Sequence, residues 1–289
     1  MALRSAWLMV AAMLAAGLSA RQQPAFHATT RVVPIYATVV GPDGHLLSQL
    51  TRNQFAVFDN GQPREIVSFS NEPIPVTLGG MWDVSLSMTK VEVRERAAAR
   101  AFVDALWADD RLRFGTFGDI VAWSPLLTSD KKTLRRIVDE EIWFGGATPL
   151  WTVIEEGVHR FAGESGRRVL VVLSDGNSRN DTQSKSDALR EMQRTDCMVY
   201  AVGLAGSGIS GSLESVAEES GGGHVELAST ADLDREFAEI LSELHHQYLI
   251  GFLPAALDGE SHTLLVRTTV AGAKVRARKS YIAAEVPDR

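Results

Sequence analysis

The chain has a single cysteine, Cys197, among its 289 residues. It can form no internal disulfide, so its stability has to come from a hydrophobic core even in an oxidising compartment. Cys197 lies beside the strand-like run 198–204, which predicts a buried structural thiol and not a reactive one. Hydrophobic residues make up 45% of the chain and charged residues 22%. This ordinary balance excludes a long disordered, collagen-like or coiled-coil protein.

An excess of basic residues is also missing, because 29 Lys and Arg stand against 36 Asp and Glu, a formal net charge of −7. An acidic chain repels phosphate backbones, so we expect no nucleic-acid partner. The longest apolar run, Ala6–Leu18, follows Arg4 and is shorter than the roughly 20 residues of a membrane-spanning helix. With Ser19-Ala20 after it, this run predicts a signal peptide over residues 1–20. We therefore expect export to the periplasm or the extracellular medium, a mature chain that begins near Arg21, and no membrane span after cleavage.

Hydrophobic patterning divides the rest of the chain into three stretches. Residues 21–72 and 247–289 contain short strand-like runs and turns. Residues 73–246 alternate helical stripes with continuous apolar runs, which is typical of strands buried on both faces. The sequence therefore predicts an α/β domain with a doubly wound, mostly parallel sheet and helices on both faces. Each flank is too short to bury a core of its own, so we expect the N- and C-terminal flanks to form one small β module together.

Two details of the flanks make this expectation specific. The dipeptide Asn60-Gly61 predicts a hairpin between strands at 55–58 and 65–69. The stretch Lys274–Ile282 predicts a strand whose basic residues alternate with small apolar ones. We interpret that basic run, Lys274, Arg276, Arg278 and Lys279, as a solvated face of a half-exposed strand, with a patch for an anionic partner as the alternative.

Oxygen-bearing side chains gather where the predicted core strands end. Asp83, Ser85 and Ser87 lie between the first core strand and the helix after it. Thr148 stands just before a predicted helix, and Asp175 ends a buried strand. The carboxyl ends of neighbouring parallel strands share one edge of a sheet, so the three loops are expected to converge. Hydroxyl and carboxylate oxygens without His or Cys suit a hard cation such as Mg²⁺ or Ca²⁺.

The order and spacing of these residues resemble the metal-ion-dependent adhesion site of von Willebrand factor A-type domains, an Asp-x-Ser-Gly-Ser motif followed by a Thr and then an Asp after a later strand. The resemblance implies that Ser85, Ser87 and Thr148 bind a divalent cation directly, Mg²⁺ first and Ca²⁺ or Mn²⁺ as alternatives. It implies that Asp83 and Asp175 reach the cation partly through water. The flanks resemble bacterial secreted von Willebrand factor A-related proteins in the runs Leu50–Gly61, Tyr248–Pro254 and Val275–Tyr281.

One position departs from the family motif, because Leu86 stands where the family has Gly. A leucine resists the positive φ angles that glycine adopts freely. We therefore expect a strained loop and tighter cation binding in Leu86→Gly, unless Leu86 instead offers an apolar contact to a partner.

The resemblance implies an exported, non-enzymatic, adhesion-type module in which the cation coordinates an Asp or Glu carboxylate of a protein partner. Two alternatives stay open: a metal-dependent hydrolase at the same sheet edge, and a structural domain with a degenerate metal site. The run 206–211 matches a dinucleotide-binding motif but comes late in the chain, and a flexible loop is the better interpretation. Asp181, just beyond the site, is expected to be a neutral control position.

Overall fold

The computed structural model describes residues 32–140, 145–161, 163–164, 166–179, 181–204, 208–227 and 233–283. The predicted signal peptide over residues 1–20 and the expected mature start near Arg21 lie outside these ranges, as do the first two residues of the run 206–211. None of the helices within them is long and apolar enough to span a membrane.

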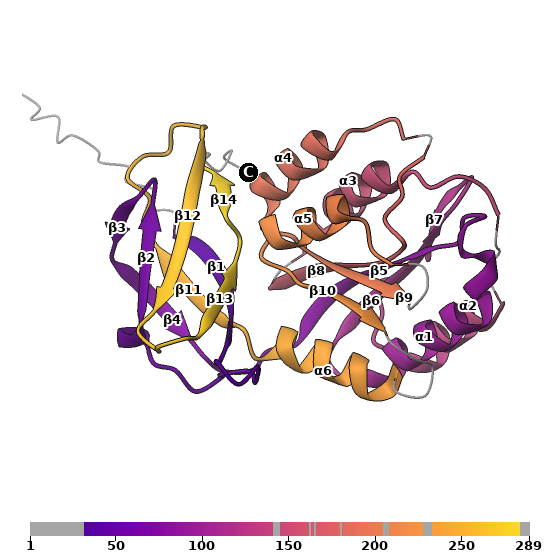
Figure 1. The fold of residues 1–289 in the computed structure, drawn as a ribbon, viewed down its shortest axis with the longest axis horizontal. Coiled ribbons are helices and arrows are strands. Elements are labelled where there is room, and N and C mark those ends of the chain that lie inside the picture. The colour runs from indigo at the N-terminus through magenta and orange to yellow at the C-terminus, as the bar shows by residue number, and fades with distance from the viewer. Residues whose placement is uncertain are drawn as a thin grey trace, which may run out of the picture. The chain divides into compact units, whose positions relative to one another are not determined.

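A six-stranded sheet forms the centre of the α/β domain (Figure 1). Its strands are β5 (Val76–Asp83), β6 (Arg111–Phe117), β7 (Val121–Trp123), β8 (Arg167–Leu173), β9 (Met198–Leu204) and β10 (His224–Leu227). They follow the order β10-β9-β8-β5-β6-β7. All neighbouring pairs from β10 to β6 are parallel, whereas β7 is antiparallel to β6. The doubly wound, mostly parallel sheet predicted from the sequence is therefore confirmed.

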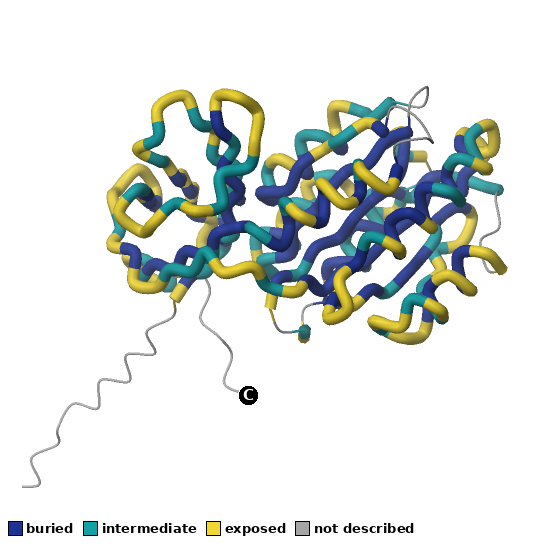
Figure 2. Tube along the Cα trace, turned by 90° about the horizontal axis from the view of Figure 1, so that it is seen from below, coloured by how far each residue is buried: buried dark blue, intermediate teal, exposed yellow. Residues whose placement is uncertain are grey.

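Helices cover both faces of this sheet (Figure 1). On one face lie α1 (Glu92–Ala105), α2 (Lys131–Glu140) and α6 (Leu233–His245), and on the other α3 (Leu150–Phe161), α4 (Lys185–Thr195) and α5 (Gly211–Glu219). All eight residues of β5 are buried, and the centre of the α/β domain is dark blue in Figure 2. Cys197 is also buried, and burial raises the pKa of its thiol to about 12, as expected for a structural residue.

Two glycines in β5 make room for large rings on the two faces of the sheet. A Cβ atom at Gly79 would lie 2.6 Å from the Phe161 ring, and one at Gly80 would lie 2.6 Å from the Trp82 ring. Real Cβ atoms do not approach so closely. The Gly-Gly pair, which is unusual inside a strand, is therefore required by the packing of α3 and of Trp82 on β5.

The β module consists of two four-stranded antiparallel sheets, with strand orders β13-β1-β11-β4 and β14-β12-β2-β3. The strands are β1 (Val33–Val40), β2 (Phe55–Asp59), β3 (Gln62–Arg64), β4 (Ile66–Ser70), β11 (Tyr248–Phe252), β12 (Ser261–Thr268), β13 (Lys274–Ala277) and β14 (Ser280–Ile282). A short 3₁₀ turn at Arg52–Gln54 precedes β2. A second one at Met88–Val91 precedes α1 in the α/β domain. Each sheet contains strands from both flanks, which confirms that the flanks form one module.

The predicted hairpin is correct in its turn and wrong in its partner strand. Asn60 (φ 49°) and Gly61 (φ 75°) form a tight turn with left-handed backbone, and this turn joins β2 to β3. The next run, β4, was expected to be the partner of β2 but pairs with β11 in the other sheet. The turn is a local property of Asn-Gly, whereas the partner of β4 depends on a strand far along the chain.

The predicted strand Lys274–Ile282 is two strands in different sheets, and its basic face is solvated only in part: Lys274 and Lys279 are exposed, whereas Arg276 is half-buried and Arg278 is buried. Arg276 of β13 is half-buried and forms an ion pair with Glu243 of α6. Lys279, which follows β13, donates from Nζ to Glu219 of α5 at 3.1 Å. Acidic residues of the α/β domain therefore pair with these cations, which the local alternation pattern did not predict.

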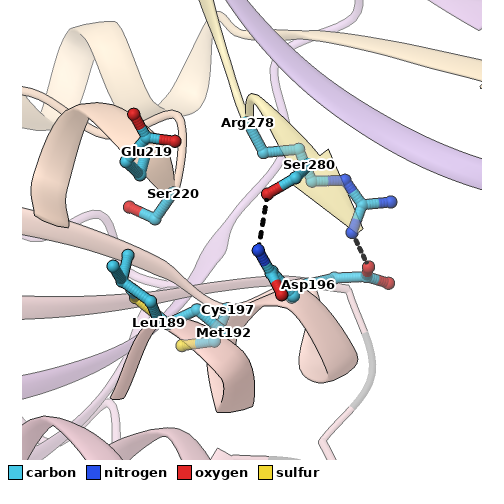
Figure 3. A pocket seen from close by; sticks show the side chains of 9 residues that line it. Leu189, Met192, Asp196, Cys197, Glu219, Ser220, Arg278 and Ser280 are labelled. Atoms are coloured by element: carbon cyan, nitrogen blue, oxygen red, sulfur yellow. Dashed lines mark hydrogen bonds and ion pairs between the residues drawn. The ribbon is translucent and has the colours of Figure 1, made fainter. Parts of the chain in front are cut away.

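Arg278 makes the most buried of these contacts (Figure 3). Its guanidinium donates to Asp196 Oδ1, at the end of α4, and at 2.7 Å to the carbonyl oxygen of Pro34 in β1. Nearby, Gln193 of α4 donates to the hydroxyl of Ser280 in β14 at 2.9 Å. The remaining gap is a cavity of about 20 Å³, room for about one water molecule. Polar contacts thus hold β14 against α4.

A buried histidine in the β module lies between two carboxylates. His262 Nδ1 is 2.8 Å from Asp59 Oδ1, and Nε2 is 3.2 Å from both oxygens of Asp258. Both ring nitrogens can donate only in the imidazolium form. Burial by itself lowers the pKa of His262, but the hydrogen bonds to Asp59 and Asp258 outweigh it and raise the pKa above its usual 6.5.

We expect the melting temperature of the protein to fall as the pH rises from 6.5 to 9, and to fall less in His262→Asn. A folded-state pKa above the unfolded value stabilises the fold fully below pH 6.5, and this stabilisation is lost as the pH passes the folded-state pKa. A change of about 1 kcal/mol corresponds to roughly 2–4 °C at this chain length. Thermal melts of both proteins across this range measure the difference, and parallel curves would contradict the assignment.

Candidate functional site

The loop between β5 and α1 carries the first three site residues. Asp83 ends β5 and is fully buried, and its Oδ1 accepts a hydrogen bond from the backbone N–H of Ser85 at 3.0 Å. The hydroxyls of Ser85, which is buried, and Ser87, which is exposed, lie 3.1 Å apart. The loop therefore places two hydroxyl oxygens side by side next to a buried carboxyl group.

The second loop lies against the first through backbone contacts. The N–H of Leu86 donates to the carbonyl oxygen of Gly146 at 3.1 Å, and the N–H of Gly145 donates to that of Val84 at 2.7 Å. Thr148, two residues further on, is buried. Its carbonyl oxygen accepts from the N–H of Arg179 at 2.8 Å, so the same loop also contacts the segment after β8.

The third loop, after β8, reaches Asp83 directly. Ser174 donates from Oγ to Asp83 Oδ2 at 2.5 Å, and this hydroxyl accepts from the N–H of Gly176 at 2.9 Å. Asp175 is buried, and its Oδ1 accepts from the N–H of Asn177 at 2.9 Å. The three loops thus meet at the carboxyl edge of the sheet, where the first loop contacts both the loop of Thr148 and the loop of Asp175.

Two carboxyl groups lie close together in this buried site. Burial raises the pKa of Asp83 to about 6; hydrogen bonds from Ser174 and Ser85 act against that rise, and the charge of Asp175 adds to it. With two acids and little counter-charge, the ionised site is electrostatically unfavourable. A bound cation would relieve this repulsion.

The donor set fits a small hard cation. Octahedral Mg²⁺ binds oxygen at about 2.0–2.1 Å, so neighbouring ligands lie roughly 3 Å apart, close to the 3.1 Å between Ser85 Oγ and Ser87 Oγ. Within the described part of the chain, no three His, Cys, Asp or Glu side chains form a group that could hold a metal. Any cation here would therefore depend on hydroxyl ligands as well as the two Asp, which favours Mg²⁺ over Zn²⁺.

The family model of the von Willebrand factor type A domain matches residues 81–241, from the end of β5 to α6. The chain belongs to this family. A comparison with curated proteins finds no match.

Three solved structures are similar to this chain at low sequence identity. A von Willebrand factor type A protein from Catenulispora acidiphila is 12% identical, with a TM-score of 0.50 over 89% of this chain and 74% of that one. An aerotolerance-related membrane protein from Bacteroides fragilis, with multiple mutations to serine, is 16% identical and has a TM-score of 0.48. The match covers 58% of this chain and 98% of that one. Proximal thread matrix protein 1 from the mussel byssus is 14% identical and has a TM-score of 0.47. The match covers 63% of this chain and 49% of that one.

Leu86, which replaces the family glycine, is not strained in this von Willebrand factor A domain. Among the described non-glycine residues, left-handed φ angles occur at Asn60 and Asp196. The prediction that Leu86 distorts the loop is therefore wrong, because the turn uses a backbone conformation open to any residue. Leu86→Gly consequently has no strain to relieve, and the side chain is 68% exposed beside Ser85 and Ser87.

Asp119, which sequence reasoning did not select, shapes the second loop of the domain. Its Oδ1 accepts from the N–H of Ala147 at 3.1 Å. Gly146 has φ +98°, and a Cβ there would lie 2.3 Å from the backbone nitrogen of Asp119. The pair Gly145-Gly146 was the available signal, since it indicates such a close backbone approach.

Asp181 is not the neutral position that the sequence predicted. It accepts hydrogen bonds from the N–H groups of Trp151 and Thr152 at 3.0 and 2.9 Å, and from the Thr152 hydroxyl at 2.9 Å. Asp181 therefore caps the first turn of α3, directly after Thr148. Asp181→Ala would disturb the second loop and is unsuitable as a control.

Proposed function

We propose that this chain is an exported, non-enzymatic binding protein whose von Willebrand factor A domain holds a divalent cation, Mg²⁺ first, at the carboxyl edge of its sheet. The cation would bind Ser85, Ser87 and Thr148 directly and Asp83 and Asp175 partly through water. An Asp or Glu carboxylate of a protein partner would complete the coordination shell. The observation that carries the proposal is the pair of serine hydroxyls 3.1 Å apart beside the buried Asp83.

The chemistry of the site favours recognition over hydrolysis. When bound, the cation supplies a positive charge with an open coordination position, because neutral hydroxyls fill much of its shell. The Ser85 hydroxyl lies against the Ser87 hydroxyl and not against a histidine base, so the geometry does not activate it as a nucleophile. A carboxylate is the ligand that such a cation prefers.

Apolar side chains flank the proposed cation site. Leu86 is 68% exposed and Ile120 is 77% exposed. The segments of both residues contact the second loop: the N–H of Leu86 donates to Gly146, and Asp119, the neighbour of Ile120, accepts from Ala147. We propose that the partner places an apolar side chain on this pair next to its carboxylate.

Peptides selected from a random display library on the immobilised protein in Mg²⁺, and eluted with EDTA, test this proposal. We expect them to contain Asp or Glu beside an apolar residue and to lose binding when the acid is changed to its amide. Leu86→Ser should weaken binding of a selected peptide about fivefold or more, because burial of part of a leucine contributes on the order of 1 kcal/mol.

Leu126→Ser is the matched control. Leu126 is 62% exposed, but its segment lies beside the amino-terminal half of β6, where Thr128 bridges Leu112. This variant should bind peptide as the wild type does. Selected peptides that lack acids, or binding that persists in EDTA, would contradict the proposed function.

A further inference from the structure

A carboxyl group in α1 is buried without a partner. Glu95 is 1% exposed, and within the described chain neither of its carboxyl oxygens has a hydrogen-bond partner. Burying a polar group in this way costs about 1–3 kcal/mol, and more if the group is charged. An apolar residue would avoid this cost, so a buried glutamate here needs an explanation.

Glu95 lies on the buried face of α1, near the start of the helix. It shares the inward stripe of α1 with Ala98 and Phe102, and the Phe102 ring packs on Trp82 with centroids 5.4 Å apart. Glu95 lies two turns nearer the start of α1, where the loop that follows Asp83 enters the helix. Burial raises the pKa of Glu95, and the negative charge of Asp83 is the next largest cause of this rise. The influence of Asp83 agrees with a position near the cation site.

We infer that Glu95 supports cation binding through its charge, as a third acidic group behind Asp83 and Asp175. The inference rests on the proposed function. A negative charge buried near a cation site favours the bound cation by Coulomb attraction, which is stronger inside a protein than in water. An unpartnered, buried carboxyl group at this place is then a part of the site that becomes favourable only when the cation is bound.

Calorimetric titration of the full chain with MgCl₂ at pH 8 tests the inference. We expect Glu95→Gln, which keeps the shape and removes the charge, to weaken Mg²⁺ binding at least tenfold, whereas Glu95→Asp keeps most of the affinity. Glu92→Gln removes the same charge from the same helix at a half-exposed position and should bind Mg²⁺ as the wild type does. Glu95→Met has a side chain of similar length without a carboxyl group, and its Mg²⁺ affinity should equal that of Glu95→Gln. The two variants remove the same charge, so either can test the inference if the other folds poorly.

A purely structural role would give a different pattern. Glu95→Gln would then change the melting temperature in EDTA and leave the Mg²⁺ dissociation constant within twofold of wild type. That result, together with loss of binding in Asp83→Asn, would overturn the role of Glu95 and leave the proposed function intact. A wild-type protein that shows neither heat nor a shift in melting temperature with Mg²⁺ would overturn both.

Discussion

Asp83→Asn is expected to abolish the cation-induced rise in melting temperature and to raise the melting temperature of the cation-free protein. The folded-state pKa of Asp83 is about 6, against an ordinary 3.8. The free energy of unfolding of the cation-free protein therefore falls as the pH rises from 3.8 to 6, because Asp83 ionises less readily in the folded state. Above pH 6 the ionised carboxylate destabilises the folded state by up to about 3 kcal/mol. Asparagine has no charge and still accepts from Ser85.

The wild type should respond to cations in the opposite way. A cation at about 100 times its dissociation constant stabilises the folded state by roughly 2.7 kcal/mol, which corresponds to a rise of about 5–10 °C. Thermal melts at pH 8 in EDTA, Mg²⁺, Ca²⁺ and Mn²⁺ measure this rise. Asp175→Ala should lose it as Asp83→Asn does, because each variant removes one of the two carboxylates of the site.

Asp109→Asn is the control for the loss of one charge, since Asp109 is exposed just before β6, at the opposite edge of the sheet. It should keep the full cation response. A normal response in Asp83→Asn would remove Asp83 from the site. Identical wild-type melts in chelator and in all three cations would favour the alternative of a structural domain with a degenerate site.

The core of this fold could be predicted because its strands are buried on both faces. The continuous apolar runs of β8 and β9 are typical of strands buried on both faces. The helical stripes of α3 and α6 match the buried residues of those helices, whereas the stripe of α1 matches only in part. The meeting of the three loops that carry Asp83, Thr148 and Asp175 followed from the shared carboxyl edge of parallel strands. These are consequences of patterns within one element, or of a general rule of topology.

The interactions that the sequence did not predict join residues far apart in the chain. Ser174 donates to Asp83, and Arg278 pairs with Asp196. From the local sequence alone, Ser174 would be interpreted as a turn residue and Arg278 as a solvated base. Only the tertiary structure shows their partners. Glu95 shows the same limit, because the sequence indicated neither its burial nor the influence of the Asp83 charge on it.

A chain that ends at Gly259 is expected to lose the β module and keep the α/β domain. The truncation removes β12, β13 and β14, so that β2 loses the partner that pairs Val57 with Val266, and β1 loses β13. Leu264, Val266 and Tyr281 leave the module core. At about 1.5–3 kcal/mol for each buried side chain, this loss is comparable to the whole stability of a small domain.

Limited proteolysis with trypsin, followed by mass spectrometry, measures the effect. Cleavage should appear at Arg52 and Arg64 of the first flank, while the α/β domain resists, because its two core clusters contain no residue beyond Leu244. A chain that ends at Ala283 keeps every strand of the module and should resist trypsin as the full chain does. Equal resistance of all three proteins would show that the first flank folds without the second.

Val266→Asp in the full chain separates loss of the module core from loss of the contacts with α4 and α5. It places a charge in the core, where Val266 is 7% exposed, and leaves Arg278 and Lys279 in place. A buried, unpaired carboxylate costs several kcal/mol, so cleavage at Arg52 and Arg64 should match that of the truncated chain. Arg278→Ala does the reverse of Val266→Asp, because it leaves the module core intact and removes the hydrogen bond to Asp196. If the core holds the module together, this second variant stays resistant at both sites.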